Sequence, residues 1–222
     1  MLLAREAERL EAFAQEIGAE AEPCDVGDRI RVEEVAARVG ERHEAIHLLV
    51  NNAGIAAGGG FLDVAPERIE QVIRTNYLGS VWCLRAFLPL LRRGAPSDVV
   101  NIASVAGAVV GPKSGPYSAS KHAQLAFSRG LASELEGTGV RVHAVNPGPV
   151  PTPGFPQERA QAGRLTRRLV VQADDVARAV LRAVEHDRRE TFIPWPFRIA
   201  AAAQGLAPGS LSRLTARLRR HR

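Results

Sequence analysis

The chain has 222 residues, of which 45% are hydrophobic and 24% charged, so it has the composition of a globular domain and not of a disordered or low-complexity protein. No apolar run is long enough to cross a bilayer, and the N-terminus lacks the pattern of a secretory signal peptide. A net charge of +5 suits a phosphorylated cofactor, an anionic membrane surface or plain solubility, and with aromatic residues at only 5% we expect no nucleic-acid binding.

The cysteines and histidines argue against a disulfide framework and against a metal site. Cys24 and Cys83 are far apart and form no CxxC pair, and the six histidines have no metal-ligand spacing. We therefore expect a reduced, cytoplasmic protein without a bound metal.

Apolar runs and helical patterns alternate along the whole chain. Strands are predicted, in chain order, at residues 2–4, 21–24, 47–50, 98–103, 140–145 and 191–194. Helical periodicity is found at residues 5–17, 28–42, 66–93, 116–136 and 173–187. The alternation predicts a single α/β domain over residues 1–222, with a parallel sheet covered by helices on both faces. Residues 196–222 form a basic tail, either an amphipathic helix over the substrate cleft or on a membrane surface, or a solvated charged end.

Small and polar residues follow most of the predicted strands. In chain order these are Arg5, then Asp25 and Val26, then NNAG at 51–54, SVAG at 104–107 and NPGPVPT at 146–152. In an open parallel sheet, ligands bind beyond the carboxyl ends of the strands. The pattern therefore predicts one site along this edge, although each segment taken alone is also an ordinary turn.

The segment GPYSASKHAQ carries a tyrosine and a lysine one helical turn apart. Tyr117 and Lys121, at positions i and i+4, share a face of the predicted helix. A nearby ammonium favours the phenolate, so the pair is suited to proton exchange. The alternative is a chance pair on a solvated helix face.

Five motifs taken in order, NNAG, RTNYLGS, NIASVAG, YSASK and NPGPVPT, resemble the short-chain dehydrogenase/reductase family over nearly the whole chain. The resemblance implies a Rossmann-like, doubly wound parallel sheet in three α/β/α layers. It also implies hydride transfer between a nicotinamide cofactor and a small carbonyl or alcohol substrate. Helices 66–93 and 116–136 would form the contacts of a homodimer or homotetramer, as they do in many relatives.

The resemblance implies catalytic roles for Ser104, Tyr117, Lys121 and Asn76. Tyr117 would be the general acid/base, and Lys121 would draw the pKa of the phenol toward working pH and bind the nicotinamide ribose. Ser104 would bind the substrate oxygen, or its hydroxyl would only stabilise the end of the strand. Asn76 would hold a water that links Lys121 to solvent, or would compensate a helix kink through backbone bonds.

The cofactor residues implied by the resemblance lie at the strand ends. They are Arg5, Asp25, Val26, Asn52, Ala53, Gly54, Val150 and Thr152, together with Tyr117 and Lys121. Asp25 and Val26 would meet the adenine, the turn 52–54 the adenosine ribose, and Val150 and Thr152 the carboxamide. Asp25 could instead cap the helix that follows it, and Thr152 could cap the segment that follows Thr152.

Arg5 decides the expected cofactor. Relatives that bind NAD place an acid after the second strand, and here Ala4 and Arg5 stand at that position. An arginine can bind a 2′-phosphate with two parallel hydrogen bonds, so NADP(H) is expected and NAD is less favoured. The alternative is that Arg5 is an ordinary surface residue.

One part of the family pattern is absent from the sequence. The first strand, its TGxxxGxG turn and the following helix have no counterpart, and GIAAGGG at 54–60 fits a substrate-side loop better than a phosphate-binding turn. Two explanations stay open: the chain is a piece of a longer enzyme, or it is a shortened relative that binds a ligand or partner without turnover. We favour the first, because Met1 lies inside an apparent strand.

The substrate side is predicted at the loops 55–64, 106–116 and 150–165. The first two are rich in Gly, Ala and Val, which favours an apolar carbonyl compound. The sequence does not identify that compound or the direction of the reaction. Dehydration or epimerisation with the same cofactor is less favoured, because the Ser/Tyr/Lys set is intact.

Overall fold

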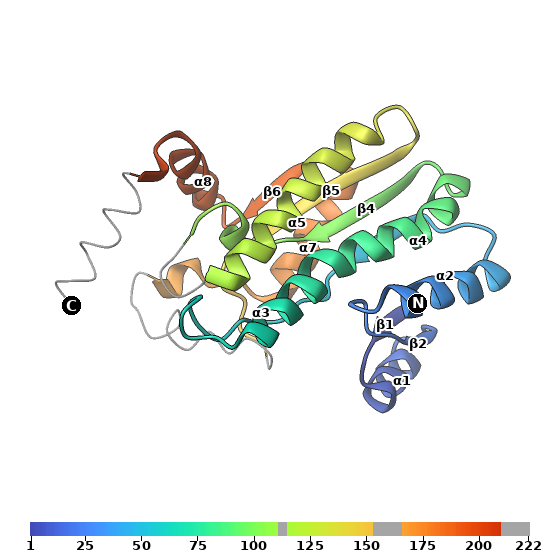
Figure 1. The fold of residues 1–222 in the computed structure, drawn as a ribbon. Coiled ribbons are helices and arrows are strands. Elements are labelled where there is room, and N and C mark those ends of the chain that lie inside the picture. The colour runs from blue at the N-terminus through green and yellow to red at the C-terminus, as the bar shows by residue number, and fades with distance from the viewer. Residues whose placement is uncertain (111–114, 153–165, 210–222) are drawn as a thin grey trace.

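The computed structural model describes residues 1–110, 115–152 and 166–209 as an α/β protein (Figure 1). Its strands are β1 (Leu2–Ala4), β2 (Ala21–Pro23), β3 (Leu48–Asn51), β4 (Ser97–Ile102), β5 (Val140–Pro147) and β6 (Glu190–Ile193). Every strand pair is parallel, which confirms the predicted parallel architecture. The predicted strands agree with the observed ones to within a residue or two at each end.

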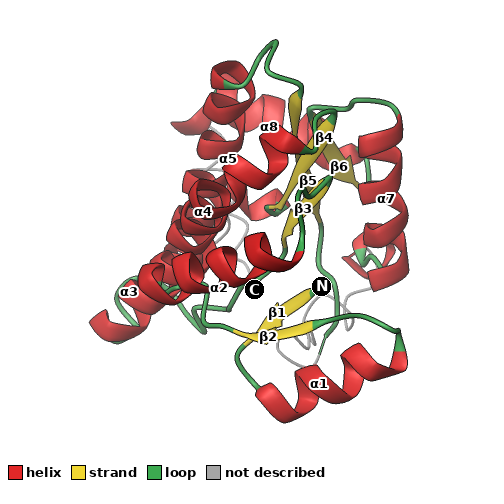
Figure 2. Ribbon diagram, turned by 90° about the vertical axis from the view of Figure 1, so that its right-hand side faces the viewer, coloured by secondary structure: helices red, strands yellow, loops and turns green. Residues whose placement is uncertain are grey.

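Helices cover both faces of the strands (Figure 2). The longer ones are α1 (Ala7–Glu16), α2 (Arg29–Arg42), α3 (Pro66–Ile73), α4 (Gly79–Arg93), α5 (Gly115–Glu134), α7 (Ala173–Glu185) and α8 (Pro196–Leu206). Short turns of 3-10 helix, η2 (Val105–Gly107) and η3 (Thr166–Leu169), lie in the connections. Helices α2, α4 and α5 pack on one face, and α1 and α7 on the other.

The predicted helix 66–93 is continuous but not uniform. A turn of π-helix, η1 (Arg74–Leu78), separates α3 from α4 and has Asn76 at its centre. The extra residue of a π-turn redirects the side chains that follow, and such turns are frequent at functional sites. The kink expected at Asn76 is therefore present, as a π-turn.

The strands form two sheets and not one. β1 and β2 form a pair, and β3, β4, β5 and β6 form a four-stranded sheet in that order. The pair is held to the rest by helix packing: Leu3 of β1 and Leu49 of β3 both contact a buried cluster built by α2 and α4. Within the larger sheet, β4 and β5 are buried along almost their whole length, as strands covered on both faces should be.

The C-terminal tail is described only in part. α8 occupies the first half of the predicted basic tail, whereas residues 210–222 lie outside the described part of the chain. Among the described helices, none is long and apolar enough to cross a membrane.

Candidate active site

The carboxyl ends of β3 and β4 meet the first turns of α5. Asn51 pairs with Asn101 across β3 and β4, so both strands end at the same edge. The connection after β4 then touches the backbone of α5: a Cβ on Gly107 would lie 2.6 Å from the carbonyl oxygen of Lys121. Only glycine allows this approach, and it brings the β4 connection against the tyrosine and lysine of α5.

Ser104 links this connection to Tyr117. Its hydroxyl accepts a hydrogen bond from the N–H of Ala106 at 3.1 Å and lies 3.5 Å from the carbonyl oxygen of Pro147. It also forms a hydrogen bond with the phenol of Tyr117. Both predicted roles of Ser104 are therefore compatible, because the hydroxyl caps the strand end and faces the phenol.

Burial raises the pKa of Tyr117 above its usual value, and the hydrogen bond with Ser104 opposes that rise. Burial is thus the largest effect on this phenol, and the downward pull of Lys121 together with an oxidised nicotinamide stays a prediction. At neutral pH the phenol is thus protonated and available as a proton donor.

Lys121 is almost completely buried, with 3% of its surface exposed. Its ammonium donates to the carbonyl oxygen of Ile102 at 2.9 Å and to Oε1 of Gln124 at 2.8 Å. Burial lowers the pKa of Lys121 to about 7. Of its three donors, two have acceptors among the described residues, so one remains for a further acceptor such as a sugar hydroxyl.

Asn76 joins three parts of the site through its side chain. Its Oδ1 accepts from the N–H of Ile55 at 2.8 Å, and its Nδ2 donates to the carbonyl oxygen of Ile55 at 3.1 Å and to the hydroxyl of Ser120 at 3.0 Å. The side chain thus fixes the loop after β3 against α5. The side chain does bond backbone groups, but those of Ile55 and not those of its own helix, and the water-holding role stays a prediction.

The NNAG turn reaches the same place. A Cβ on Gly54 would lie 3.6 Å from both Asn76 Oδ1 and Lys121 Nζ. Asn52 and Ala53 precede it and are exposed beyond β3. The structure therefore brings the predicted ribose-binding turn beside the predicted catalytic residues.

Asp25 and Val26 lie at the end of β2, on the other side of the break between the sheets. The carboxylate of Asp25 accepts from the N–H of Gly27 at 2.9 Å. It does not cap α2: Asp28 does, accepting from the N–H groups of Ile30 and Arg31. The alternative that Asp25 is the helix cap is therefore wrong, and its carboxylate lies beside an open hollow.

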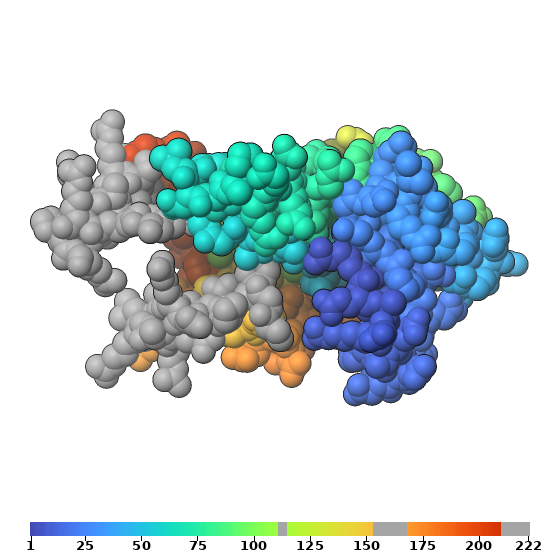
Figure 3. Space-filling view, turned by 60° about the horizontal axis from the view of Figure 1, so that its bottom comes forward, coloured from blue at the N-terminus to red at the C-terminus, as the bar shows by residue number. Residues whose placement is uncertain are grey.

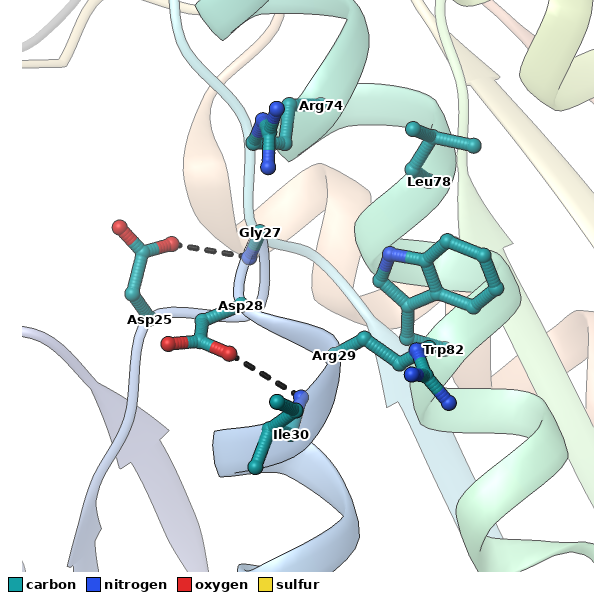
Figure 4. A pocket seen from close by; sticks show the side chains of 8 residues that line it. All are labelled: Asp25, Gly27, Asp28, Arg29, Ile30, Arg74, Leu78 and Trp82. Atoms are coloured by element: carbon teal, nitrogen blue, oxygen red, sulfur yellow. Dashed lines mark hydrogen bonds between the residues drawn. The ribbon is translucent and has the colours of Figure 1, made fainter.

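That hollow has a volume of about 500 Å³ (Figure 4). Its lining comprises Asp25, Gly27, Asp28, Arg29, Ile30, Arg74, Leu78 and Trp82. It lies between the start of α2 and the η1–α4 helix. The indole of Trp82 and the guanidinium of Arg74 give it one apolar and one cationic wall, so a flat heterocyclic ring fits its chemistry.

The remaining predicted residues lie at strand ends without a specific contact to the cluster. Arg5 is exposed directly after β1. Val150 is half-buried and Thr152 exposed after β5, next to Pro149, whose carbonyl accepts from the N–H of Val171. The loop residues 111–114 and 153–165 of the predicted substrate side lie outside the described part of the chain.

Sequence reasoning missed a buried polar network behind Lys121. Gln124 donates to the hydroxyl of Ser80 at 2.8 Å, and its carbonyl accepts from Ser128 at 2.8 Å. Asn101 donates to that same Ser128 hydroxyl at 2.9 Å and accepts from Asn51 at 2.8 Å. The signal was present, because Gln124 lies at i+3 from Lys121 on one helix face.

The chain is similar in sequence to known proteins. A family model described as short chain dehydrogenase matches residues 1–163. The chain is 39% identical over 171 residues to 1-deoxy-11-beta-hydroxypentalenate dehydrogenase of Streptomyces exfoliatus, covering 74% of this chain and 61% of that protein. It is 30% identical to dehydrogenase/reductase SDR family member 7B of Bos taurus, covering 97% of this chain and 72% of the relative.

Solved structures share the fold. A short chain dehydrogenase from Burkholderia cenocepacia in complex with NADP matches with a TM-score of 0.80 and 25% identity, over 96% of this chain and 84% of that one. An alcohol dehydrogenase from Thermococcus sibiricus, complexed with 5-hydroxy-NADP, matches with a TM-score of 0.73 and 28% identity, over 86% of this chain and 82% of that one. The predicted Rossmann-like fold is thereby confirmed.

Proposed function

The chain belongs to the short-chain dehydrogenase/reductase family, and on that premise we propose that it is an oxidoreductase acting on a small carbonyl or alcohol compound with NADP(H). The observation that carries the proposal is the hydrogen bond between Ser104 and Tyr117, with Lys121 buried one helical turn away. Because the chain spans 61% of the length of the Streptomyces relative, its activity, substrate and partners are all part of the proposal.

Tyr117 supplies the proton. When bound, the nicotinamide supplies or accepts a hydride, and negative charge develops on the substrate oxygen in the reductive direction. The raised pKa keeps the phenol protonated at neutral pH, so Tyr117 donates to that oxygen. Ser104 orients the phenol and offers a second hydrogen bond to the same oxygen.

Lys121 and Asn76 hold the rest of the site in place. The third donor of Lys121 is directed to a ribose hydroxyl, because Gly54 leaves space beside the ammonium. Asn76 fixes the loop that carries Gly54 and, in this proposal, also holds the water that links Lys121 to solvent. Asn52 and Ala53 lie against the adenosine ribose.

The choice of NADP(H) over NAD follows from Arg5. Arg5 is exposed directly after β1, where its guanidinium is free to pair with a 2′-phosphate. Asp25 and Val26 contact the adenine, and Val150 and Thr152 contact the carboxamide. Support comes from the two solved relatives above, whose descriptions name NADP and 5-hydroxy-NADP.

The phosphate end of the cofactor is the incomplete part of the site. The sequence has no TGxxxGxG turn, and a helix N-terminus after such a turn is the usual holder of a pyrophosphate. We propose that the strand, turn and helix of that unit are missing from this chain and that the chain alone binds NADP(H) weakly.

The substrate side is apolar. The ring of Phe61 lies against Gly115 at the start of α5, so closely that a Cβ there would clash with it. Phe61 and Leu62 are both exposed, and Phe61 contacts the start of the helix that carries Tyr117. An apolar ketone or alcohol suits this surface, and the chain is expected to act as a homodimer or homotetramer through α4 and α5.

The test is turnover by matched tyrosine variants. NADPH oxidation is followed with a panel of apolar ketones, for this chain and for a version extended upstream by a family-type strand–TGxxxGxG–helix unit. Tyr117→Phe should lower kcat about 10²- to 10⁴-fold. Tyr77→Phe is the control, because it removes the chain's other phenol, whose ring packs edge-to-face on Phe127. Equal turnover by both variants would exclude Tyr117 as the acid.

The second candidate is a relative that binds a ligand or partner without turnover. The absent glycine-rich turn is the feature that favours it. It predicts no change in NADPH fluorescence at millimolar cofactor for either the chain or its extended version. Binding that returns with the extension would instead support the enzyme.

A further inference from the structure

Helix α8 turns its apolar side away from the protein. None of its residues is buried, and the side chains on its inner side are half-buried: Phe197, Ala200, Ala201 and Gln204. Trp195, Ile199 and Leu206 are 68%, 61% and 88% exposed. A surface helix normally directs its apolar stripe to the core and its polar residues to solvent. In α8 this arrangement is reversed, because Gln204 is on the inner side and the larger apolar side chains are outside.

The exposed apolar residues form one stripe. Its members follow one another at intervals of four, three and four residues: Trp195, whose backbone is already helical, Ile199, Ala202 and Leu206. In an α-helix this spacing places side chains in line on one side. On the opposite side, the ring of Phe197 lies so close to Gly148 that a Cβ there would clash with it. Phe197 therefore anchors α8 beyond the end of β5, and the stripe faces outward.

α8 lies at the end of the molecule where the strands have their carboxyl ends. It follows β6, whose last residue, Ile193, pairs with Pro147 at the end of β5. Figure 1 shows α8 and α3 at this end, and the space-filling view in Figure 3 shows the N-terminal residues at the opposite end. The connections that leave β3 and β4 at this edge carry further exposed apolar side chains: Phe61, Leu62 and Val110.

The positive charge of the protein is concentrated in the segment that contains α8. Residues 191–222 have six arginines and neither Asp nor Glu. Because the whole chain carries +5, the first 190 residues together carry −1. Arg198 is exposed on α8 itself. Arg168 is exposed in η3, and the end of η3 approaches Gly148, as Phe197 does. A negatively charged surface is therefore attracted to the side of the molecule that carries the stripe.

We propose that α8 docks on the surface of an anionic lipid bilayer and inserts Trp195, Ile199 and Leu206. A helix that docks in this way lies in the plane of the interface, with its apolar stripe at the boundary between headgroups and acyl chains. The arginines of the same segment pair with the lipid phosphates. The indole of Trp195 suits this boundary, because its ring is apolar and its N–H bonds to a headgroup.

The stripe fits a bilayer better than it fits another macromolecule. A nucleic acid needs a row of cations for its phosphates, and the only charged residue of α8 is Arg198. A stable protein partner needs about 800 Å² of matched surface on each side, which a stripe one helix wide does not supply. A bilayer needs no matched shape, and its anionic headgroups complement the arginines.

Binding of the full chain to vesicles tests the proposal. Vesicles of phosphatidylcholine alone are compared with vesicles of phosphatidylcholine and phosphatidylglycerol in equal parts, and bound protein is separated by flotation. The chain should bind the anionic vesicles at least ~10-fold more strongly. Raising NaCl from about 0.1 M to about 1 M should weaken this binding, because the screening length falls from about 10 Å to about 3 Å.

A matched pair of variants separates insertion of α8 from a general attraction of the arginines. Ile199→Glu should weaken binding to the anionic vesicles at least ~10-fold, because it places a carboxylate in the stripe. Leu181→Glu is the control: Leu181 lies on α7, is 58% exposed against 61% for Ile199, and undergoes the same change of charge. Leu181→Glu should bind as the parent does. Both positions are exposed, so both variants should stay folded.

Trp195 reports insertion directly. The chain has two tryptophans, so Trp82→Phe leaves Trp195 as the only indole. The emission of Trp195 should shift to shorter wavelength with the anionic vesicles, because the ring leaves water. Trp195→Phe leaves Trp82, which packs between α2 and α4, and its emission should not shift. NADPH and substrate are absent from these assays, so their result is independent of the proposed catalytic function.

Several outcomes would overturn the proposal. One is the absence of binding to the anionic vesicles. Another is equal binding by Ile199→Glu and Leu181→Glu, or bound protein with unshifted Trp195 emission, because charge alone would then explain the attraction. A third is a dimer in the absence of lipid that Ile199→Glu dissociates and Leu181→Glu does not, since a second copy would then cover the stripe. A fourth is binding of duplex DNA that Ile199→Glu abolishes.

Discussion

Tyr117 and Lys121 are shifted in opposite directions by the same cause. Burial raises the pKa of Tyr117 and lowers the pKa of Lys121 to about 7, so each side chain is driven toward its neutral form. The two residues lie one helical turn apart on α5, so at neutral pH the phenol keeps its proton while Lys121 can gain or lose one. The motif identified the pair from sequence, but burial, which decides the sign of both shifts, depends on the fold.

Replacing Lys121 with Met should change how stability depends on pH. The lysine loses its proton near pH 7 in the folded chain and near 10.5 in the unfolded chain, so the unfolded state holds more protons between these values. Burying the charge therefore costs most below pH 7 and progressively less up to 10.5. Lys121→Met should be more stable than the parent by up to roughly 5 kcal/mol at pH 6, with a smaller difference at pH 9.

Urea unfolding of both proteins at the two pH values measures this difference. The comparison between parent and variant is needed because burial also raises the pKa of Cys83 to about 12, which lowers the stability of both proteins as pH rises above 9. A constant difference across pH 6–9 would contradict a buried, titrating Lys121.

Gln124 should set the pKa of Lys121 through its Oε1 contact of 2.8 Å. Gln124→Glu places a carboxylate at the ammonium and should raise that pKa by at least about one unit. Gln124→Leu removes the acceptor and should lower it. The titration of Lys121, followed by NMR of its side chain, distinguishes the two variants, and shifts of the same sign in both would contradict this role.

At the scale of elements, the η1 turn is held by one side chain. Asn76 is fully buried and bonds both backbone groups of Ile55. Asn76→Ala leaves those groups without a partner and should lower the free energy of unfolding by roughly 3 kcal/mol. Asn52→Ala, at an exposed position, should change it by less than about 0.5 kcal/mol. Chemical denaturation compares the two, and equal stability would show that water replaces Asn76.

Most elements were predictable because the spacing of hydrophobic residues within each segment indicates a helix or a strand. The buried runs of β4 and β5 and the amphipathic α2 and α7 are local signals, and they matched the structure closely. The π-turn was foreseen only as a kink at Asn76, because the extra residue depends on contacts with Ile55 and Ser120, which are distant in sequence. The same holds for the polar network of Gln124, whose partners lie on other elements.

At the scale of the whole molecule, the break between the two sheets divides the chain into two parts that are stabilised by different amounts of packing. The larger part has four paired strands between helices, whereas β1, α1 and β2 are joined to it by the cluster under α2 and α4. The sequence pattern predicted parallel strands alternating with helices, but it did not predict that the strands would form two sheets joined through α2–α4 packing. A small apolar interface should open before the larger sheet does.

The same leucine-to-alanine change, made separately at the adjacent positions Leu90 and Leu91, tests whether the two parts open independently. Leu90 is buried in the α2–α4 cluster, and Leu91 is buried in the cluster that α4 forms with β4, β5 and α5.

A leucine-to-alanine change in a core costs about 2–5 kcal/mol, which is at least ~30-fold in an opening equilibrium. Leu90→Ala should therefore lower hydrogen-exchange protection at least ~30-fold in β1, β2 and α2, with little change in β4 and β5. Leu91→Ala should lower protection in β4 and β5 as well, because it weakens the larger sheet that supports both parts. If both variants lower protection equally everywhere, the chain opens as one unit, and the N-terminal strands are supported as firmly as the rest.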